Sequence, residues 1–213
     1  VATMRNPEKE TELTKLNHVT VLPLDVTDLA QIKSTVERTI TLGGTDVVFN
    51  NAGYALTGAL ESISDDKMVR QINTNLLGTL RVTQAFIPYF RQRRNGLFIA
   101  TTSIGGIYTF PLNSLYHATK WALEGWSESM SFELAAFNIG IKTIAPGGII
   151  TDFMDRSLDA NSLPEYQQLE NKVANGMSEG LKTASTAEQI AEVVYEAATD
   201  GKDQVRYVAG ADA

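Results

Sequence analysis

Short apolar runs rich in β-branched residues alternate with longer stretches of helical periodicity, and this alternation restricts the fold more than any other feature of the chain. In the first long stretch, Ile32, Val36 and Ile40 recur at four-residue spacing, as on the buried face of a helix. The runs predicted to be strands are residues 19–24, 46–49, 97–100, 141–145 and 205–208. The predicted helices are residues 29–42, 66–90, 115–137 and 185–198. Because parallel strands need crossovers of about a dozen residues or more, the pattern predicts one α/β domain with a mostly parallel sheet.

Local signals mark where some of these helices begin and end. Two glycines, at 43 and 44, follow the first predicted helix, and glycine commonly ends helices. Before the last predicted helix, Ser185 with Glu188 and Thr186 with Gln189 both fit a capping box. In that motif a hydroxyl at the helix start and a side chain three residues later each bond the other's backbone N–H. We therefore expect this helix to start beside one of the two hydroxyls.

The composition excludes several classes of function. A chain of 213 residues suits one globular domain, which we assign to residues 1–213. The absence of Cys excludes disulfide frameworks, thiolate zinc sites and a cysteine nucleophile, and with only two His residues we predict no metal site. A formal net charge of −7 without a basic stripe argues against nucleic acid as a partner. No apolar run approaches the roughly 20 residues that span a bilayer, so we predict no membrane association and a cytoplasmic location.

The residues that directly follow the predicted strands are polar, glycine-bearing or both. Ligands of parallel α/β sheets bind outside the carboxyl ends of the strands. The positions concerned are Asp25, residues 50–53, residues 101–103 and residues 146–151. Polar loops and glycine-containing turns are the ordinary alternative at any one strand end. In that alternative Asn50 and Asn51 would bond their own turn, whereas in a binding site they would line a flat ligand.

Two hydroxyls and an ammonium form a candidate reactive group. Tyr116 and Lys120 are four residues apart and therefore share one face of a predicted helix. A free phenol has a pKa of about 10, and a nearby cation lowers that pKa, so the Tyr can exchange a proton with a carbonyl or alcohol oxygen. Ser103 follows the preceding strand, and the glycines at 105 and 106 allow a close turn that would bring its hydroxyl towards Tyr116. Taken alone, a Tyr–Lys pair of this spacing occurs by chance on many surface helices.

The order of these residues resembles that of the short-chain dehydrogenase/reductase family in its compact single-domain form. The resemblance covers essentially the whole chain. The residues that carry it are 50–53, Asn75, Ser103, Tyr116, Lys120 and 146–151, in that order. The family has a Rossmann-type, doubly wound and mostly parallel sheet. The resemblance therefore implies an NAD(P)-dependent oxidoreductase that transfers hydride between a nicotinamide cofactor and a carbonyl or secondary alcohol.

The resemblance also implies a role for each matching residue. Tyr116 would be the general acid/base on the substrate oxygen, and Ser103 would hydrogen-bond that oxygen. Lys120 would bind the nicotinamide ribose and lower the pKa of Tyr116. Asn75 would hold a water of the proton relay, although a mid-helix amide can equally be a buried group bonded to neighbouring backbone. Cofactor contacts are further implied for Asp25, Val26, Asn51, Ala52, Gly53, Pro146, Gly147, Ile149 and Thr151.

The sequence departs from the family pattern in two places. The glycine-rich turn that receives the cofactor phosphates is absent, and no Gly-x-Gly occurs in the chain. We therefore expect the first strand–turn–helix unit of the sheet to be missing from these residues, as in a partial record of a longer polypeptide. His117 matches no role in the family pattern, and we interpret it as an ordinary helix residue.

Arg5 indicates which cofactor is preferred. In the family, an acidic residue at the end of the second strand binds the ribose 2′-hydroxyl of NAD. Residues 3–6 hold no carboxylate here, and the guanidinium of Arg5 has the fork geometry that pairs with a 2′-phosphate. We predict a preference for NADP, with NAD as the alternative cofactor. The alternative is that Arg5 is solvated or caps the next helix, in which case it would not distinguish NADP from NAD.

Residues 152–183 occupy the place of the family's substrate lid. Their apolar members are Met154, Leu158, Leu163, Tyr166, Leu169, Val173 and Met177. These residues predict an apolar carbonyl or alcohol substrate, or else an ordinary packed helix. The two long helices, 66–90 and 115–137, form the subunit interface in many relatives, so the resemblance implies a homodimer or homotetramer.

Other classes of protein compete with this interpretation. The main alternative is a noncatalytic cofactor-sensing protein of the same fold, although such proteins often lose members of the Ser103, Tyr116 and Lys120 set, which is complete here. An epimerase or dehydratase with the same Tyr–Lys pair needs a larger substrate domain than 213 residues supply. The phosphate-binding loop of nucleotide hydrolases is absent from the sequence.

Overall fold

The computed structural model describes residues 1–210, apart from the side chain of Met154. Its main sheet contains four parallel strands in the order β10–β6–β5–β3. Their bounds are Val47–Asn50 (β3), Gly96–Thr101 (β5), Ile139–Pro146 (β6) and Arg206–Ala209 (β10). Four of the apolar runs therefore form the parallel sheet that their alternation with helices predicts.

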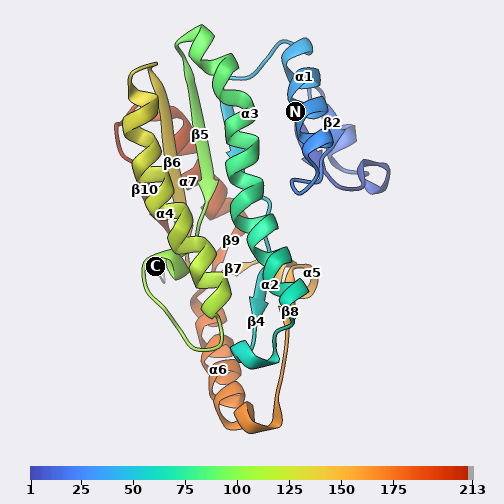
Figure 1. Ribbon diagram of the computed structural model, residues 1–213, viewed down its shortest axis with the longest axis vertical. Helices are drawn as coiled ribbons and strands as arrows, with labels where there is room; N and C mark the ends of the chain where they lie inside the picture. The colour runs from blue at the N-terminus through green and yellow to red at the C-terminus, as the bar shows by residue number, and fades with distance from the viewer. Residues whose placement is uncertain (211–213) are drawn as a thin grey trace.

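A second parallel sheet pairs β1 (Ala2–Met4) with β2 (Val21–Pro23). Among the described residues, neither strand is paired with β3, so the two sheets are separate. Figure 1 shows this pair beside α1 (Leu29–Thr41), away from the four-stranded sheet. Helix α1 begins where the sequence predicts, because the carboxylate of Asp28 accepts two backbone N–H bonds from its first turn.

Helices cover both faces of the main sheet. Helices α3 (Gly78–Arg93) and α4 (Ser114–Ala135) pack on one face and α7 (Ala187–Thr199) on the other (Figure 1). The core on the α3 and α4 side contains Ile32, Val36, Val48, Val82, Phe86, Phe90, Phe98, Leu134, Ile139 and Ile141. The core on the α7 side contains Ile99, Ile144, Ile190, Ala197, Tyr207 and Ala209. Phe98 and Ile99 thus point to opposite faces of β5, as expected in a doubly wound sheet.

The predicted helix at 66–90 is interrupted. Helix α2 (Asp65–Ile72) leads into a π-helical turn (Asn73–Leu77), which leads into α3. Gly78 allows α3 to begin close to the loop after β2, since a Cβ there would lie 2.7 Å from Val26. Apolar periodicity does not reveal such a turn, because the residues on either side keep helical spacing. Single π-helical turns are frequent at functional sites.

Two short parallel pairs hold residues 152–183 against the rest of the molecule. They are β4 (Ala55–Thr57) with β8 (Leu158–Ala160), and β7 (Ile149–Ile150) with β9 (Ser185–Thr186). Between β7 and β9 lie α5 (Phe153–Arg156) and α6 (Gln167–Gly180). The remaining short helical turns are Pro7–Lys9, Leu13–Lys15, Leu60–Ser62, Ile104–Gly106, Pro164–Tyr166 and Leu181–Thr183. The sequence did not predict either strand pair, because two or three residues are too few to show an alternating pattern.

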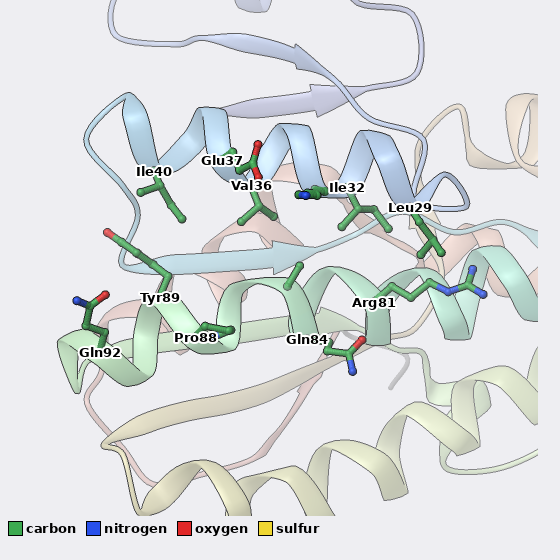
Figure 2. A pocket seen from close by; sticks show the side chains of 12 residues that line it. Leu29, Ile32, Val36, Glu37, Ile40, Arg81, Gln84, Pro88, Tyr89 and Gln92 are labelled. Atoms are coloured by element: carbon green, nitrogen blue, oxygen red, sulfur yellow. The ribbon is translucent and has the colours of Figure 1, made fainter.

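A groove of about 570 Å³ lies between α1 and α3. In Figure 2, Ile32 and Val36 of α1 point towards α3, where Arg81 and Tyr89 lie along the opposite wall. None of the residues predicted to bind cofactor or substrate lines this groove. The candidate site must therefore be built from the side chains at the strand ends.

Candidate active site

The carboxyl ends of the main-sheet strands meet at one edge. Asn50 of β3 is in register with Ala100 of β5, and Thr101 of β5 with Ile144 of β6. The loops that follow these strands therefore leave the sheet at the same edge, as the strand-end pattern predicts. The side chain of Asn50 donates to the hydroxyl of Thr83 at 3.1 Å, and the amide oxygen of Asn51 accepts from the hydroxyl of Thr101 at 2.7 Å. These bonds tie the end of β3 to α3 and β5.

Strand β5 and helix α4 bring Ser103 and Tyr116 together. Ser103 follows β5, and its Oγ accepts a hydrogen bond from the N–H of Gly105 at 3.0 Å, which caps the tight turn Ile104–Gly106. Tyr116 lies in the first turn of α4. Part of the residue remains exposed, but its phenol is largely surrounded by protein. The side chain of Ser103 lies within hydrogen-bonding reach of the Tyr116 phenol. The two hydroxyls can therefore address one oxygen atom, as we predicted from their spacing.

Lys120 completes this group one helical turn after Tyr116. Its side chain is buried, and its Nζ donates to the carbonyl of Thr101 at 2.8 Å. The same Nζ lies 5.6 Å from the centroid of the Tyr116 ring. Gly106 permits the close approach of the turn to α4, since a Cβ there would lie 3.0 Å from the carbonyl of Lys120. The end of β5, the glycine turn and one face of α4 thus converge.

Burial governs the charge of Tyr116 and Lys120. Burial raises the pKa of Tyr116, and the hydrogen bond with Ser103 offsets this only in part. Burial also lowers the pKa of Lys120 to about 8, against the attraction of the Glu124 carboxylate. We predicted that the pKa of Tyr116 lies below its ordinary value, with Lys120 as the cause. In the structure the net shift is upward, because loss of hydration outweighs the hydrogen bond with Ser103. The phenol is therefore neutral at pH 7 and able to donate a proton.

Asn75 lies in the π-helical turn and is almost fully buried. Its amide oxygen accepts from the N–H of Tyr54 at 3.0 Å, and its amide nitrogen donates to the carbonyl of Tyr54 at 2.8 Å. Gln71, one turn earlier, bonds the N–H of Leu56 at 2.7 Å and the carbonyl of Tyr54 at 3.0 Å. The alternative that we kept open for Asn75, a buried amide bonded to backbone, therefore describes its side chain in this structure.

Residues predicted to contact the adenosine end of a cofactor follow β1 and β2. The carboxylate of Asp25 accepts from the hydroxyl and the N–H of Thr27, at 2.7 and 2.9 Å. These bonds, assisted by the charge of Arg5, hold the pKa of Asp25 below its ordinary value. Arg5 itself is exposed. Val26 lies against Gly78 at the start of α3. The structure thus places Arg5 and Asp25 near each other.

The remaining predicted cofactor residues lie in two loops at the main-sheet edge. In the first loop, Asn51 and Ala52 are exposed. Gly53 lies next to the side chain of Asn75, since a Cβ on Gly53 would be 3.4 Å from Asn75 Oδ1. The second loop leaves β6 at Pro146 and is tied at both ends. The Gly147 N–H donates to the Ala209 carbonyl at 2.9 Å, Ile149 pairs with Ser185, and the Thr151 hydroxyl accepts from the Phe153 N–H at 3.3 Å. This loop is therefore held close to the strand ends.

Sequence reasoning missed Glu124, which lies on the same face of α4 as Tyr116 and Lys120, one turn further on. Its side chain is 3% exposed and carries a carboxylate. The hydroxyls of Thr102 and Thr143 donate to it, and the guanidinium of Arg206 pairs with it at 2.8 Å. The four-residue spacing of Tyr116, Lys120 and Glu124 was the signal that could have identified it.

His117 also differs from its interpretation as an ordinary helix residue. Its ring is buried, and both ring nitrogens lie within hydrogen-bonding distance of backbone atoms of Gly105 and Phe110. The sequence around His117 did not predict these bonds, because Gly105 and Phe110 precede α4 and are not at helical spacing from His117.

Residues 1–210 contain neither a cluster of metal ligands nor a membrane-spanning helix. In this part of the chain, no three His, Asp or Glu side chains are grouped so that they could hold a metal ion. No helix in the same range is long and apolar enough to cross a membrane.

Comparison of the chain with a family model, with related proteins and with solved structures identifies its family. A family model described as short chain dehydrogenase matches residues 1–162. The chain belongs to the short-chain dehydrogenase family. It is an oxidoreductase of that family, with the family's Rossmann-like parallel sheet.

Individual relatives agree with this assignment. An uncharacterised oxidoreductase of Schizosaccharomyces pombe is 40% identical over 208 residues, which is 97% of this chain and 88% of the relative. Human 17-beta-hydroxysteroid dehydrogenase type 1 is 33% identical over 193 residues, covering 87% of this chain and 58% of the relative. A crystal structure of a short-chain dehydrogenase from Streptomyces avermitilis matches with a TM-score of 0.86 at 27% identity, covering 99% of this chain and 79% of the other.

Proposed function

We propose that this short-chain dehydrogenase uses NADP(H) to interconvert an apolar carbonyl compound and its alcohol. The observation that carries the proposal is the convergence of the Ser103 and Tyr116 hydroxyls beside the buried ammonium of Lys120. When bound, the nicotinamide supplies or accepts the hydride. In the reducing direction, negative charge builds on the substrate oxygen, and two hydroxyls donating to that oxygen stabilise it.

Tyr116 acts as the general acid in reduction and the general base in oxidation. Its raised pKa keeps the proton on the phenol at neutral pH, so the proton is available to the substrate oxygen. The ammonium of Lys120, near the ring, stabilises the phenolate that remains after transfer. Asn75 shapes the site by holding the Tyr54 backbone beside Gly53.

The residues present fit the nicotinamide and adenosine ends of a dinucleotide, whereas the glycine-rich turn for its phosphates is absent from the sequence. One of the three N–H groups of the Lys120 ammonium donates to the Thr101 carbonyl, and the others can donate to ribose hydroxyls. Asn51 and Ala52, just before Gly53, are exposed and can therefore face a ligand. Arg5 is exposed beside Asp25, as a partner for a 2′-phosphate would be. A solved structure of ElxO with NADP bound has a TM-score of 0.76 to this chain at 25% identity, which supports NADP over NAD.

An apolar substrate is favoured by side chains around the predicted lid. Ile150, Phe153, Met177 and Leu181 are exposed to solvent, which is unusual for so many apolar groups in one segment. The side chain of Met154, which we also predicted to belong to this cover, lies outside the described residues. Relatives named for apolar compounds include the hydroxysteroid dehydrogenase and human retinol dehydrogenase 8, the latter 35% identical over 175 residues. We therefore place the substrate among hydrophobic ketones, aldehydes and alcohols.

A homodimer or homotetramer is part of the proposal. Helix α4 leaves Trp121 and Phe132 exposed, the latter with 78% of its surface open to solvent. Large apolar side chains on one helix are typical of protein interfaces. The cytoplasmic location stays a prediction.

The test of the proposal is the turnover of Tyr116→Phe with NADPH and a panel of apolar ketones. Removing the phenolic proton donor should lower kcat by about 10²- to 10⁴-fold. The affinity for NADPH, measured by cofactor fluorescence, should change little. Tyr195→Phe, on the exposed side of α7, is the matched control and should keep wild-type turnover. Near-normal turnover of Tyr116→Phe would refute the acid/base role, and binding of NADPH without any turnover by the wild type would favour a cofactor sensor.

A further inference from the structure

The ring of His117 is bonded on both sides. Its Nδ1 lies 2.6 Å from the carbonyl oxygen of Gly105, and the N–H of Phe110 donates to its Nε2 at 3.0 Å. The carbonyl of Phe110 is farther from Nε2, at 3.2 Å. Because a carbonyl can only accept and a backbone N–H can only donate, the proton belongs on Nδ1 and Nε2 is bare. The neutral Nδ1–H tautomer of His117 satisfies both partners.

Gly105 links this ring to the reactive hydroxyls. While its carbonyl accepts from His117, its own N–H donates to Ser103 Oγ at 3.0 Å. The N–H bond occupies a lone pair of Ser103 and leaves the hydroxyl proton free to point at Tyr116 or at a substrate oxygen. Gly105 has no room for a side chain, since a Cβ would lie 2.9 Å from His117 Nδ1. The orientation of Ser103 therefore depends on where His117 holds Gly105.

The other side of the ring holds the loop at residues 107–113. The Phe110 ring packs edge-on against His117, with centroids 4.4 Å apart. Two residues later, Leu112 has a φ of +62°, which is rare for a residue with a side chain. Its carbonyl accepts from the N–H of Gly58 at 2.7 Å. A conformation of this kind persists only where surrounding contacts hold it, and the bond from Phe110 to His117 is one of them.

We propose that His117 is a positioning residue that orients Ser103 through Gly105 and anchors the 107–113 loop through Phe110. Nδ1 bonds Gly105, and Nε2 bonds Phe110. Its effect on turnover rests on the proposed function, whereas the two hydrogen bonds can be tested without turnover. No position of the family pattern supplied this role. The His117 ring also lies beside the Tyr116 ring, with centroids 6.2 Å apart.

Two substitutions separate the two tasks. In His117→Asn, the amide nitrogen occupies the place of Nδ1 and keeps a donor for Gly105, but nothing accepts from Phe110. In His117→Gln, the longer side chain places its amide at Nε2 and keeps an acceptor for Phe110, but the donor to Gly105 is lost. Both variants are neutral and polar, so they form a matched pair.

Nuclear magnetic resonance tests the hydrogen bonds directly. The chain has only two histidines, and His18 is exposed, so the ring nitrogens of His117 can be assigned by comparison with His117→Gln. At neutral pH we expect the proton of His117 on Nδ1. In His117→Asn, amide hydrogen exchange should speed up by about tenfold at Phe110, because its N–H loses its acceptor. In His117→Gln, exchange should speed up by about tenfold at Gly105, because its N–H bond to Ser103 loosens once its carbonyl is released. A proton on Nε2, or equal loss of protection at both amides in both variants, would overturn the assignment.

Steady-state kinetics tests the consequence for Ser103. In His117→Gln we expect kcat to fall about tenfold with an unchanged KM for NADPH, because one neutral hydrogen bond positions the hydroxyl. His117→Asn keeps the donor to Gly105, so its kcat should fall much less than that of His117→Gln. In a Ser103→Ala background, His117→Gln should have no further effect on kcat, since its target is gone. A purely structural role predicts lower melting temperatures with kcat unchanged in both variants, which would refute positioning.

The two proposals fail in different ways. If the wild type turns over no ketone or alcohol, the proposed function fails, and the exchange pattern at Gly105 and Phe110 still decides the role of His117. If the wild type is active and the loss in His117→Gln is the same with and without Ser103, the function stands and the positioning role fails.

Discussion

At the scale of single residues, the charge of Lys120 reflects two opposing influences. Burial disfavours the ammonium, whereas the carboxylate of Glu124 favours it, and the resulting pKa of Lys120 is about 8. Glu124 is held in place by two threonine hydroxyls and by the guanidinium of Arg206. The charge on Lys120 is therefore present at neutral pH and is lost under mildly alkaline conditions.

This balance predicts a pH dependence of the reaction. Above a pH of about 8, Lys120 loses its proton and no longer stabilises the phenolate of Tyr116, so kcat/KM for ketone reduction should fall as the pH rises through that value. In Glu124→Gln the favourable carboxylate is removed, so the pKa of Lys120 drops and the fall should begin at lower pH. Kinetics between about pH 6 and about pH 9.5 would show both effects. A profile that stays level across pH 8 would contradict the role given to Lys120.

The choice of cofactor also depends on one residue. Arg5 should pair with the 2′-phosphate of NADP, so Arg5→Ala should lower the ratio of kcat/KM for NADPH over NADH by about 10- to 100-fold. Arg38→Ala, an exposed arginine on α1, is the control and should leave the ratio unchanged. Equal use of both cofactors by the wild type would remove the inference.

At the scale of elements, the start of α7 shows how tertiary contacts choose between two local patterns. The Thr186 hydroxyl accepts from the Gln189 N–H at 3.3 Å, and the Gln189 amide oxygen accepts from the Thr186 N–H at 2.8 Å. Ser185 fits the same motif in sequence, but it is buried in β9 and pairs with Ile149. The capping box therefore forms at Thr186, whereas Ser185 lies one residue earlier, in the strand.

The capping box gives a stability prediction. Thr186→Ala should lower the free energy of unfolding by about 1 kcal/mol, since an N-terminal N–H of α7 loses its partner. Glu192→Ala, an exposed change in the middle of the same helix, should alter it by less than about 0.5 kcal/mol. Urea denaturation measures both. Equal effects of the two substitutions would mean that the cap contributes nothing specific.

At the scale of the whole molecule, a buried ion pair joins elements that are distant in the chain. Lys142 of β6 donates to Asp200, after α7, at 2.7 Å and to the hydroxyl of Tyr207 on β10 at 3.1 Å. The Tyr207 hydroxyl donates to the other oxygen of Asp200 at 2.6 Å. The ammonium of Lys142 first, and then the Tyr207 hydroxyl, hold the pKa of Asp200 far below its ordinary value. This cluster fastens the last strand to the sheet.

The depressed pKa of Asp200 predicts the response of the fold to acid. A carboxyl whose pKa is lower in the folded state contributes stability that is complete above its unfolded pKa, about 4, and is lost as the pH falls towards the folded value. Asp200→Asn leaves Lys142 buried without its counter-ion, so it should be less stable at pH 7. Below about pH 4 the free energy of unfolding of the wild type should approach that of the variant. Parallel curves for the two proteins, measured by urea denaturation, would contradict this account.

The same three scales separate what was predictable from what was not. Alternating runs and helical spacing predicted the strands of the main sheet and most helices, because these signals lie within a few neighbouring residues. The order of Ser103, Tyr116 and Lys120 predicted the reactive group, because a strand, a short turn and a helix bring residues at that spacing together. The π-helical turn at Asn73–Leu77 was not predictable from such spacing, because the residues on either side of it keep helical periodicity.

By itself, then, the sequence determined the α/β architecture and the family, and it singled out the candidate reactive residues on α4, since each depends on local pattern or on residue order. Only the tertiary structure decided that burial raises the pKa of Tyr116, that Glu124 faces Arg206 from 82 positions away, and that His117 bonds the turn beside Ser103. Hydration and long-range hydrogen bonds depend on which distant residues are brought into contact. Local sequence patterns do not show which distant residues come into contact, so the structure was needed to find them.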